Sequence, residues 1–253
     1  MGIVETEGII TREVKYGDTS RILTVITREF GKISVLAGGV RTNKSGLLAA
    51  TQLFSYVSFN LFKGREKSLY KINSGEILSS FNRIRESLDR MAYASYFCDI
   101  TNCVVQENAP EPEQLSLLLN ALFMLAGDKA PYEQVKAVFE FRTLAIAGLL
   151  PDMTVCRQCG SGETLAYLNP AEGCVFCAPC GKSRSPGTIH AGSAVLGAVS
   201  YISMAEPKKI FSFQLSPSSQ AYLSRLGEYC TELYLERHFK TLDYLKKVAA
   251  LEG

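Results

Sequence analysis

The sequence lacks the features of a membrane-spanning or exported protein. In its 253 residues, no apolar run reaches the roughly 18 residues that a helix needs to cross a bilayer. The first ten residues, MGIVETEGII, carry acidic side chains where a secretory leader would have a basic patch followed by an apolar run. The hydrophobic fraction of 47% is typical of globular proteins that are soluble in water. We therefore expect a cytoplasmic protein.

Histidine is scarce, and two common catalytic motifs are incomplete. Neither His190 nor His238 begins a His-x-Glu sequence upstream of Pro-Cys-x-x-Cys, which zinc deaminases require. The segment from Gly39 to Ser45 resembles a phosphate-binding P-loop but has Asn43 where glycine must precede the lysine. These absences argue against a zinc deaminase and a P-loop NTPase. The simpler interpretation of residues 39–45 is a connection that exposes Arg41 and Lys44.

The chain also has little net charge, but its charge is unevenly distributed. It contains 27 Lys and Arg against 25 Asp and Glu, which gives a net charge of +2. Residues 1–78 hold eleven Lys and Arg and seven Asp and Glu, so this part carries +4 and the remainder −2. A basic first third on a slightly acidic body indicates a polyanionic partner for the first third.

The first 78 residues have the pattern of β-strands. Five runs rich in β-branched and aromatic residues alternate with turn signals such as Tyr16-Gly17-Asp18. The runs are Ile9–Ile10, Arg21–Ile26, Lys32–Leu36, Leu53–Phe62 and Ser68–Ile77. Five strands in so short a segment suit a small closed barrel, and the OB-fold is the obvious candidate.

From residue 80 onward the pattern becomes helical. Ser79-Ser80 is expected to cap a helix from Phe81 to about Gln106. Further helices are predicted at 113–126, 132–147, 194–203 and 217–238, the last capped by Ser216. The predicted class is therefore α+β. An OB-fold nucleic-acid-binding domain occupies residues 1–79, and an all-helical domain at 80–253 carries a cysteine-rich, zinc-binding segment at 153–183.

Five of the eight cysteines lie in that segment, which reads CRQCGSGETLAYLNPAEGCVFCAPC from Cys156. Cys156-x2-Cys159 and Cys177-x2-Cys180, seventeen residues apart, have the spacing of a four-cysteine zinc site. Four thiolates satisfy a tetrahedral Zn²⁺ and leave no open coordination position. The expected zinc is therefore structural.

Cys174 leaves a second ligand set open. Cys174-x2-Cys177 would also form a knuckle, with Cys180 left over. We favour Cys177 and Cys180 because Gly181 repeats the Cys-x-x-Cys-Gly form of the first pair. The remaining cysteines, Cys98, Cys103 and Cys230, lie apart in apolar, helix-like surroundings and are interpreted as buried thiols.

Three stretches of the chain occur in an order that is typical of one family. They are YGDTSRILTVITREFGKISVLAGGVRTNKS at 16–45, FEFRTLAIAGLLPDMTVCRQCG at 139–160 and EGCVFCAPC at 172–180. Together they resemble the RecO family of bacterial DNA-repair and recombination mediator proteins. The family commonly has Gly-Gly before the second knuckle, whereas this chain has Gly173-Cys174 and hence a spare thiol there.

The resemblance implies a non-enzymatic protein that binds single- and double-stranded DNA and anneals complementary strands. It implies that the protein acts with RecR to help load RecA onto strands coated by the single-strand-binding protein SSB. It further implies association with the nucleoid, with no membrane and no small-molecule substrate. The expected phosphate contacts are Arg12, Arg21, Arg41, Lys44, Lys63, Arg65 and Lys67.

Aromatic and helical residues supply weaker candidates. Tyr16, Tyr56 and Tyr70 could stack on bases, but burial in the barrel core is the alternative for each. By resemblance, the helical domain receives the acidic, apolar C-terminal tail of SSB, with Arg142 as its cation. Alternatively, Arg142 is a buried ion-pair partner of Glu140 or Glu133.

Two other classes of function stay open at this point. An RNA-binding or translation-associated module could be built from the same barrel and zinc knuckle, because phosphate contacts do not distinguish the two polymers. A metal- or nucleotide-dependent enzyme would show turnover that depends on Cys180 or Lys44.

Overall fold

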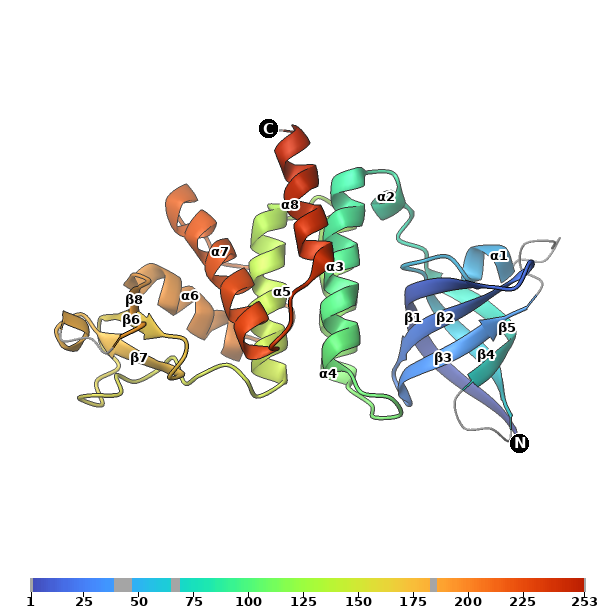
Figure 1. Cartoon of the computed structure of the whole chain (residues 1–253), viewed down its shortest axis with the longest axis horizontal. Coiled ribbons are helices and arrows are strands. Elements are labelled where there is room, and N and C mark those ends of the chain that lie inside the picture. Colours follow the sequence, from blue (N-terminus) through green and yellow to red (C-terminus); the bar gives the residue numbers. More distant parts are fainter. Residues whose placement is uncertain (1, 39–46, 65–68, 183–185, 253) are drawn as a thin grey trace. The chain divides into compact units, whose positions relative to one another are not determined.

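A computed structural model of the chain describes residues 2–38, 47–64, 69–182 and 186–252. The chain packs as two units, whose helices and strands are labelled in Figure 1. Unit 1 comprises Met1–Gly127 and Phe239–Gly253, and unit 2 comprises Asp128–His238. Within the described ranges, no helix is both long and apolar enough to cross a membrane.

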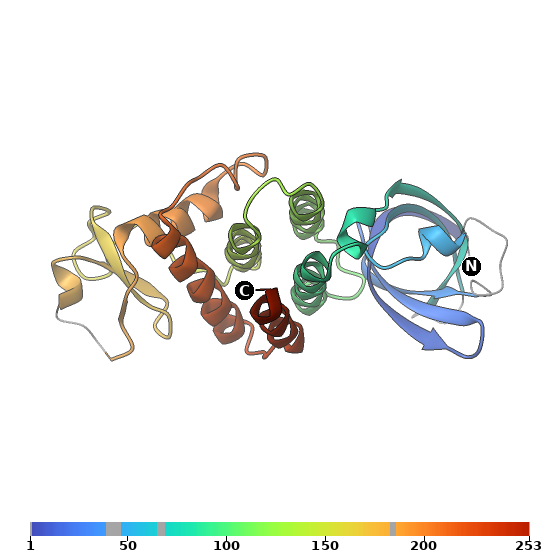
Figure 2. The same cartoon turned by 90° about the horizontal axis from the view of Figure 1, so that it is seen from above.

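Unit 1 begins with a closed barrel of five strands, seen from above in Figure 2. The strands are β1 (Gly2–Tyr16), β2 (Ser20–Thr27), β3 (Gly31–Ala37), β4 (Tyr56–Lys63) and β5 (Leu69–Ser79). They close in the order β1-β2-β3-β5-β4, with β3 parallel to β5 and the other pairs antiparallel. This arrangement confirms the predicted OB-fold barrel and, with the helices that follow, the α+β class.

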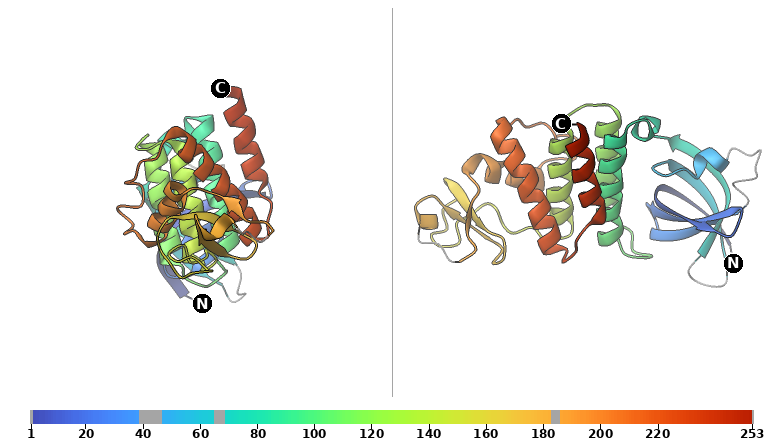
Figure 3. Two further views of the ribbon diagram at one scale, coloured as in Figure 1. Left: turned by 90° about the vertical axis from the view of Figure 1, so that its left-hand side faces the viewer. Right: turned by 45° about the horizontal axis from the view of Figure 1, so that its top comes forward.

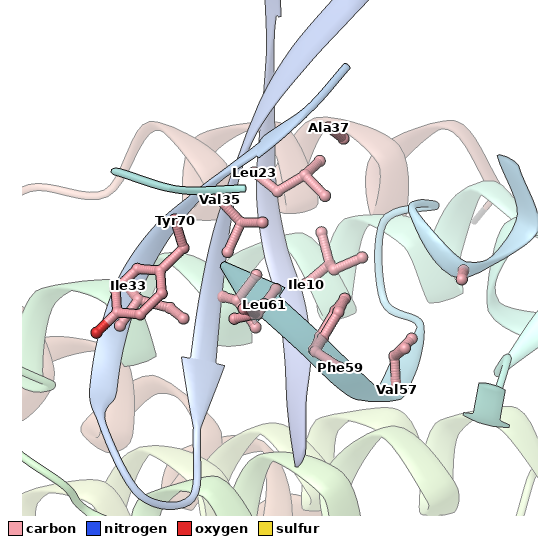
Figure 4. Close-up of a cluster of buried hydrophobic side chains, with 11 residues drawn as sticks. Ile10, Leu23, Ile33, Val35, Ala37, Val57, Phe59, Leu61 and Tyr70 are labelled. Atoms are coloured by element: carbon pink, nitrogen blue, oxygen red, sulfur yellow. The ribbon is translucent and has the colours of Figure 1, made fainter. Parts of the chain in front are cut away.

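Alternation of apolar and polar residues builds the barrel core. In β3 every second side chain is buried, and Ile33 and Val35 point inward beside Leu23 of β2 and Phe59 of β4 (Figure 4). The short helix α1 (Leu47–Ala50) adds Ala50 to the same cluster. Burial of apolar surface on this scale is the main favourable term for folding so small a barrel.

A β-bulge divides β1 into two halves. Ile10 pairs with Val25 and Arg12 pairs with Thr24, so Thr11 is the extra residue. Its hydroxyl donates to Asn102 Oδ1 at 2.8 Å, and Lys32 Nζ donates to the carbonyl of the same Asn102 at 2.8 Å. These bonds attach the barrel to helix α3 (Leu88–Val104).

Gly31 brings the β2–β3 turn against the chain that follows α3. Its φ of +62° is in the left-handed region, and a Cβ there would lie 2.0 Å from the carbonyl oxygen of Ala109. Only glycine meets both conditions. The contact is reinforced by a hydrogen bond from Asn108 N to Lys32 O at 3.3 Å.

The other helices of unit 1 are α2 (Asn82–Arg85), α4 (Pro112–Ala126) and α8 (Lys240–Glu252). The predicted cap at Ser79-Ser80 is wrong, because β5 continues through Ser79 and Ser87 caps α3 by accepting from Arg90 N. Helix α8, which was not predicted, packs against α3, and Thr241 Oγ1 donates to Asp99 Oδ2 at 3.0 Å.

Unit 2 combines three helices with a small sheet. The helices are α5 (Tyr132–Ile146), α6 (Ser193–Met204) and α7 (Pro217–Tyr234), with α5 packed against both others (Figures 1 and 3). Ser216 caps α7 as predicted, although α7 ends before residue 238. The sheet has the order β7-β6-β8, formed by β6 (Leu165–Asn169), β7 (Cys174–Cys177) and β8 (Ile189–His190), and was not predicted.

A buried ion cluster lies where α5 meets α7. Lys136 Nζ is 3.3 Å from Glu140 Oε2, 3.0 Å from Glu228 Oε1 and 3.1 Å from the carbonyl oxygen of Ser224. Burial alone would lower the pKa of Lys136, but the carboxylates, led by Glu140, raise it above its ordinary value. A Cβ at Gly227 would lie 2.4 Å from Glu140 Oε2, so α7 can approach this cluster only with glycine there.

We predict that Lys136→Ala will destabilise unit 2 by about 3–5 kcal/mol, because the buried Glu140 would lose its cation. Hydrogen exchange of the α5 and α7 amides measures this as a loss of protection. Lys209→Ala is the control, since Lys209 and Glu206 form an exposed pair that is worth about 0–1 kcal/mol. Equal effects of the two substitutions would contradict the expected role of Lys136.

Candidate functional sites: a cysteine cluster and a charged barrel surface

The structure brings together the sulfur atoms of Cys156, Cys159, Cys177 and Cys180. All four lie within 4.8 Å of one another, and Cys159 Sγ is 3.7 Å from Cys177 Sγ. Four sulfurs at about 2.3 Å from a tetrahedral zinc ion would be roughly 3.8 Å apart. Cys174 lies outside the group, with its Sγ 3.8 Å from Glu172 Oε2.

Backbone hydrogen bonds shape the first knuckle and join it to the sheet. Gly160 N donates to the carbonyl of Cys156 at 2.8 Å, and Gly160 has a φ of +73° that favours glycine. Cys156 N donates to Ser161 O at 2.8 Å. Arg157 N donates to Val175 O of β7 at 2.9 Å, which holds the first cysteine pair beside the second.

The second knuckle depends on close packing against β6. Cys180 begins a short 3-10 helix, Cys180–Lys182, in which Gly181 is buried. A Cβ at Gly181 would lie 2.1 Å from the ring of Tyr167, so a side chain there would displace the turn. Glycine follows each cysteine pair for a different reason: Gly160 adopts a positive φ, whereas Gly181 leaves room for the ring of Tyr167.

Electrostatics at the cluster favour a cation. Burial raises the pKa of Cys156, but backbone N–H groups of Cys177, Cys159 and Gln158 point at its sulfur and bring the pKa down to about 6. Hydrogen bonding to Cys177, with a smaller contribution from burial, raises the pKa of Cys180 to about 12. Four thiolates this close repel one another unless a cation lies between them. The four cysteines could hold a metal ion, and an all-thiolate set fits zinc.

The structure describes three of the seven predicted phosphate contacts: Arg12, Arg21 and Lys63. Arg12 is exposed on β1. Arg21 is less available, since its Nη1 lies 2.7 Å from Glu13 Oε2. Lys63 is exposed, with its ammonium 5.4 Å from the centre of the Tyr70 ring. The other four, Arg41, Lys44, Arg65 and Lys67, lie outside the described residues.

The three tyrosines have different environments. Tyr70 is buried in the barrel core, so the core alternative is correct for this residue. Tyr56 is half-buried and donates to Glu7 Oε2 at 2.6 Å. Tyr16 is exposed at the end of β1, where its ring could contact a base.

One exposed cation, Lys71, and a division of charge on the barrel were not predicted from the sequence. Lys71 is exposed on β5. Alternation along the strand could have identified it, because its neighbour Tyr70 points into the core and successive side chains face opposite sides. On the same outer surface, Glu7 of β1 lies opposite Ser58 of β4, which lies opposite Glu76 of β5. A polyanion would avoid this acidic part of the barrel.

Arg142 caps a helix. Its guanidinium donates to the carbonyls of Ile202 and Ser203, at 3.1 Å and 2.5 Å, where α6 ends. A cation at this end of a helix stabilises the last carbonyl groups. The expected ion pair of Arg142 with Glu140 or Glu133 is replaced by these carbonyl contacts. Glu140 contacts Lys136, and Glu133 accepts a hydrogen bond from Ser224 Oγ.

Comparison with known proteins identifies the family. A model described as Recombination protein O N terminal matches residues 1–81, and one described as Recombination protein O C terminal matches residues 85–243. The chain belongs to the RecO family. The resemblance inferred from the three sequence stretches is thereby confirmed.

Full-length RecO proteins from several bacteria are similar to this chain. The DNA repair protein RecO of Acetivibrio thermocellus is 36% identical over 248 residues, which cover 97% of each chain. That of Alkaliphilus metalliredigens is 30% identical over 248 residues, or 97% of this chain and 100% of the relative. That of Bacillus velezensis is 33% identical over 251 residues, or 99% and 97%.

We predict that Cys156→Ser will abolish metal binding, whereas Cys174→Ser will retain about one zinc ion per chain. Metal content of the purified proteins and hydrogen exchange of residues 153–182 provide the measurements. Metal loss should lower the free energy of unfolding of unit 2, since zinc contributes on the order of 10 kcal/mol in small zinc modules. The protection of barrel amides from hydrogen exchange should not change. Retention of zinc by Cys180→Ser, together with its loss from Cys174→Ser, would instead assign Cys174 as the ligand.

Proposed function

We propose that this RecO-family chain is a non-enzymatic DNA-binding recombination mediator. It anneals complementary strands and, with RecR, helps load RecA onto single-stranded DNA coated by SSB. The observation that carries the proposal is the match of both RecO family models, which together span residues 1–81 and 85–243. It favours DNA over the RNA-binding alternative, since the similar relatives are named DNA repair proteins.

The barrel supports DNA binding through its exposed cations. Arg12, Lys63 and Lys71 are exposed, while Arg21 is partly neutralised by Glu13. Cations on an OB barrel can follow a phosphate backbone, with an affinity that falls as salt concentration rises. The acidic positions Glu7 and Glu76 restrict this attraction to part of the surface.

The cysteine cluster supports a structural role for zinc. Four thiolates fill a tetrahedral shell, so a zinc ion held by them would have no position for water or substrate. Bound there, zinc would join the two knuckles and hold β7 to the loop that precedes β6. We accordingly propose that the protein performs no turnover of its own and that its effect on DNA depends on binding alone.

Arg142 remains the proposed cation for the SSB tail. Two carbonyl oxygens occupy its Nη1, but a guanidinium has five N–H donors, so further donors can bind a carboxylate. The side chain is half-buried within an apolar helix, which suits an acidic and apolar peptide.

We predict that Arg12→Ala and Lys63→Ala will each weaken single-stranded DNA binding and reduce its salt dependence by about 0.7 in the logarithmic slope. Each substitution removes one phosphate contact. Arg21→Ala should change the slope less, because Glu13 already neutralises that guanidinium. Fluorescence anisotropy at several salt concentrations measures the slopes. A larger change for Arg21→Ala than for Arg12→Ala would contradict the assignment.

The function itself is tested by strand annealing. Complementary oligonucleotides coated with SSB should anneal faster with the protein present, and faster still when RecR is added. The Arg12→Ala, Lys63→Ala double variant should anneal more slowly, whereas Lys209→Ala should match the wild type. ATP should not be hydrolysed in the absence of RecA. Failure of the wild type to anneal the coated strands, or tighter binding to RNA than to DNA of the same sequence, would refute the proposal.

A further inference from the structure

Helix α7 of unit 2 buries one side and leaves the other exposed. The side that packs against α5 and α6 carries the buried residues Leu223, Ser224, Leu226, Gly227, Cys230 and Thr231. The exposed residues recur every three or four positions, so they lie along one line on the opposite side of the helix. We name this line the outer face of α7; it consists of Ser218, Ala221, Arg225, Tyr229 and Leu233.

The two ends of the outer face differ in size. Tyr229 is 53% exposed and Leu233 is 36% exposed, although both side chains are large and mainly apolar. Before Arg225, the outer face presents only the small side chains of Ser218 and Ala221. If two such helices pack in opposite directions, the large end of each lies against the small end of the other. This fit lets the two helix axes approach to roughly 8–10 Å.

Charge is divided between the same two ends. In the first eleven residues of α7 the only charged side chain is Arg225, whereas the last seven residues carry Glu228 and Glu232. Among the residues that the structure describes, Arg225 has no carboxylate partner. Acidic residues near the C-terminus of a helix oppose its dipole, so this order does not serve the stability of α7 alone. A second α7 in the opposite direction would bring an arginine to these glutamates.

The glutamates can accept that additional cation. Glu228 Oε1 lies 3.0 Å from Lys136 Nζ, and Glu232 Oε1 lies 2.8 Å from His238 Nδ1. An ionised carboxylate has two oxygens and about four acceptor positions, so each glutamate can keep its own contact and still face a guanidinium. Both side chains are half-buried, at the border of the outer face.

One register of two antiparallel helices satisfies both divisions. When Arg225 of one copy faces Tyr229 of the other, the two-fold axis generates the reverse contact as well. The same register places Ala221 opposite Leu233, a small side chain against a large one. Each guanidinium then lies over a tyrosine ring, which is a favourable cation–π contact, and the two glutamates lie on either side of that ring. No like charges face each other.

We propose that the outer face of α7 is the contact through which two copies of this chain form a symmetric, antiparallel dimer. A single helix pair buries less surface than the roughly 1,200–2,000 Å² of a standard interface, so the dimer is weak and is populated at high protein concentration. The association does not depend on DNA. A dimer carries two barrels, and the further consequence that one assembly holds two strands rests on the DNA binding proposed above.

Disulfide trapping tests the contact and its direction. Arg225→Cys and Tyr229→Cys proteins are mixed and oxidised in air, and linked peptides are identified by mass spectrometry. The mixed dimer should exceed either homodimer about fivefold or more, because it alone brings the new thiols together and keeps one Arg225–Tyr229 contact. In the control mixture, Tyr229→Cys is replaced by Phe123→Cys, at a side chain of α4 that is 55% exposed. That mixture should give no link to residue 225.

Sedimentation measures the association without a cross-link. The average mass of the wild type should rise with protein concentration. Tyr229→Ser should weaken self-association about fivefold or more, because two symmetric ring contacts are lost. Arg225→Glu should weaken it at least as much, since it places carboxylates together. Tyr244→Ser, at a side chain of α8 that is 48% exposed, should associate like the wild type.

A wild type that stays monomeric at every concentration, or a mixture that yields no link between residues 225 and 229, would overturn the inference. Homodimer links in excess of the mixed link would also overturn it, because they would indicate a parallel pair. Weaker DNA binding by Tyr229→Ser with unchanged self-association would assign the face to DNA and refute the dimer. Failure of strand annealing by a wild type that does dimerise would instead refute the proposed function alone.

Discussion

Closure of the five-stranded sheet is the constraint from which the rest of the barrel follows. Because β1 pairs with both β2 and β4, the sheet closes on itself, and its residues are assigned to the inside or the outside. The same register that places Leu23 and Phe59 in the core aligns Phe62, Lys71 and Leu36 across three strands on the outer surface. The packing of the core and the order of side chains on the outer surface are therefore two results of one hydrogen-bond pattern.

Unit 2 adds two buried polar clusters to the apolar core between its helices. Its sheet has strands of two to five residues, too short to be stable without support. Support comes from the cysteine cluster, which joins Cys156 to the strand that ends at Cys177. Earlier in the chain, Lys136 compensates the charge of Glu140 between two helices. In the second group an ammonium group balances the buried carboxylate, and the four cysteines could hold a metal ion that would balance their thiolates in the same way.

Much of this architecture can be predicted from local patterns in the sequence. Alternation and turn residues locate β2 to β5 but only Ile9–Ile10 of the long strand β1. Helical periodicity locates α4, α5 and α6 to within one residue at each end. Cys-x-x-Cys spacing identifies the four cysteines that the structure groups. The short strands β6 to β8 cannot be predicted from the sequence, because so few residues show no clear alternation of apolar and polar side chains. The cap at Ser79-Ser80 is misplaced because β5 continues through Ser79, the short helix α2 begins after Phe81, and Ser87 caps the main helix at Leu88.

Which residues face each other on neighbouring strands cannot be predicted from the sequence, and Thr11 illustrates the reason. As the extra residue of the bulge, it changes which side chains of β1 face outward, and its hydroxyl also bonds to Asn102 of α3. Deleting this one residue would remove the bulge and, with it, one of the two side-chain hydrogen bonds that attach the barrel to α3. A length change at this position therefore affects the attachment of the barrel to α3, whereas a length change at the exposed turn around Gly17 affects the register of the β1–β2 hairpin.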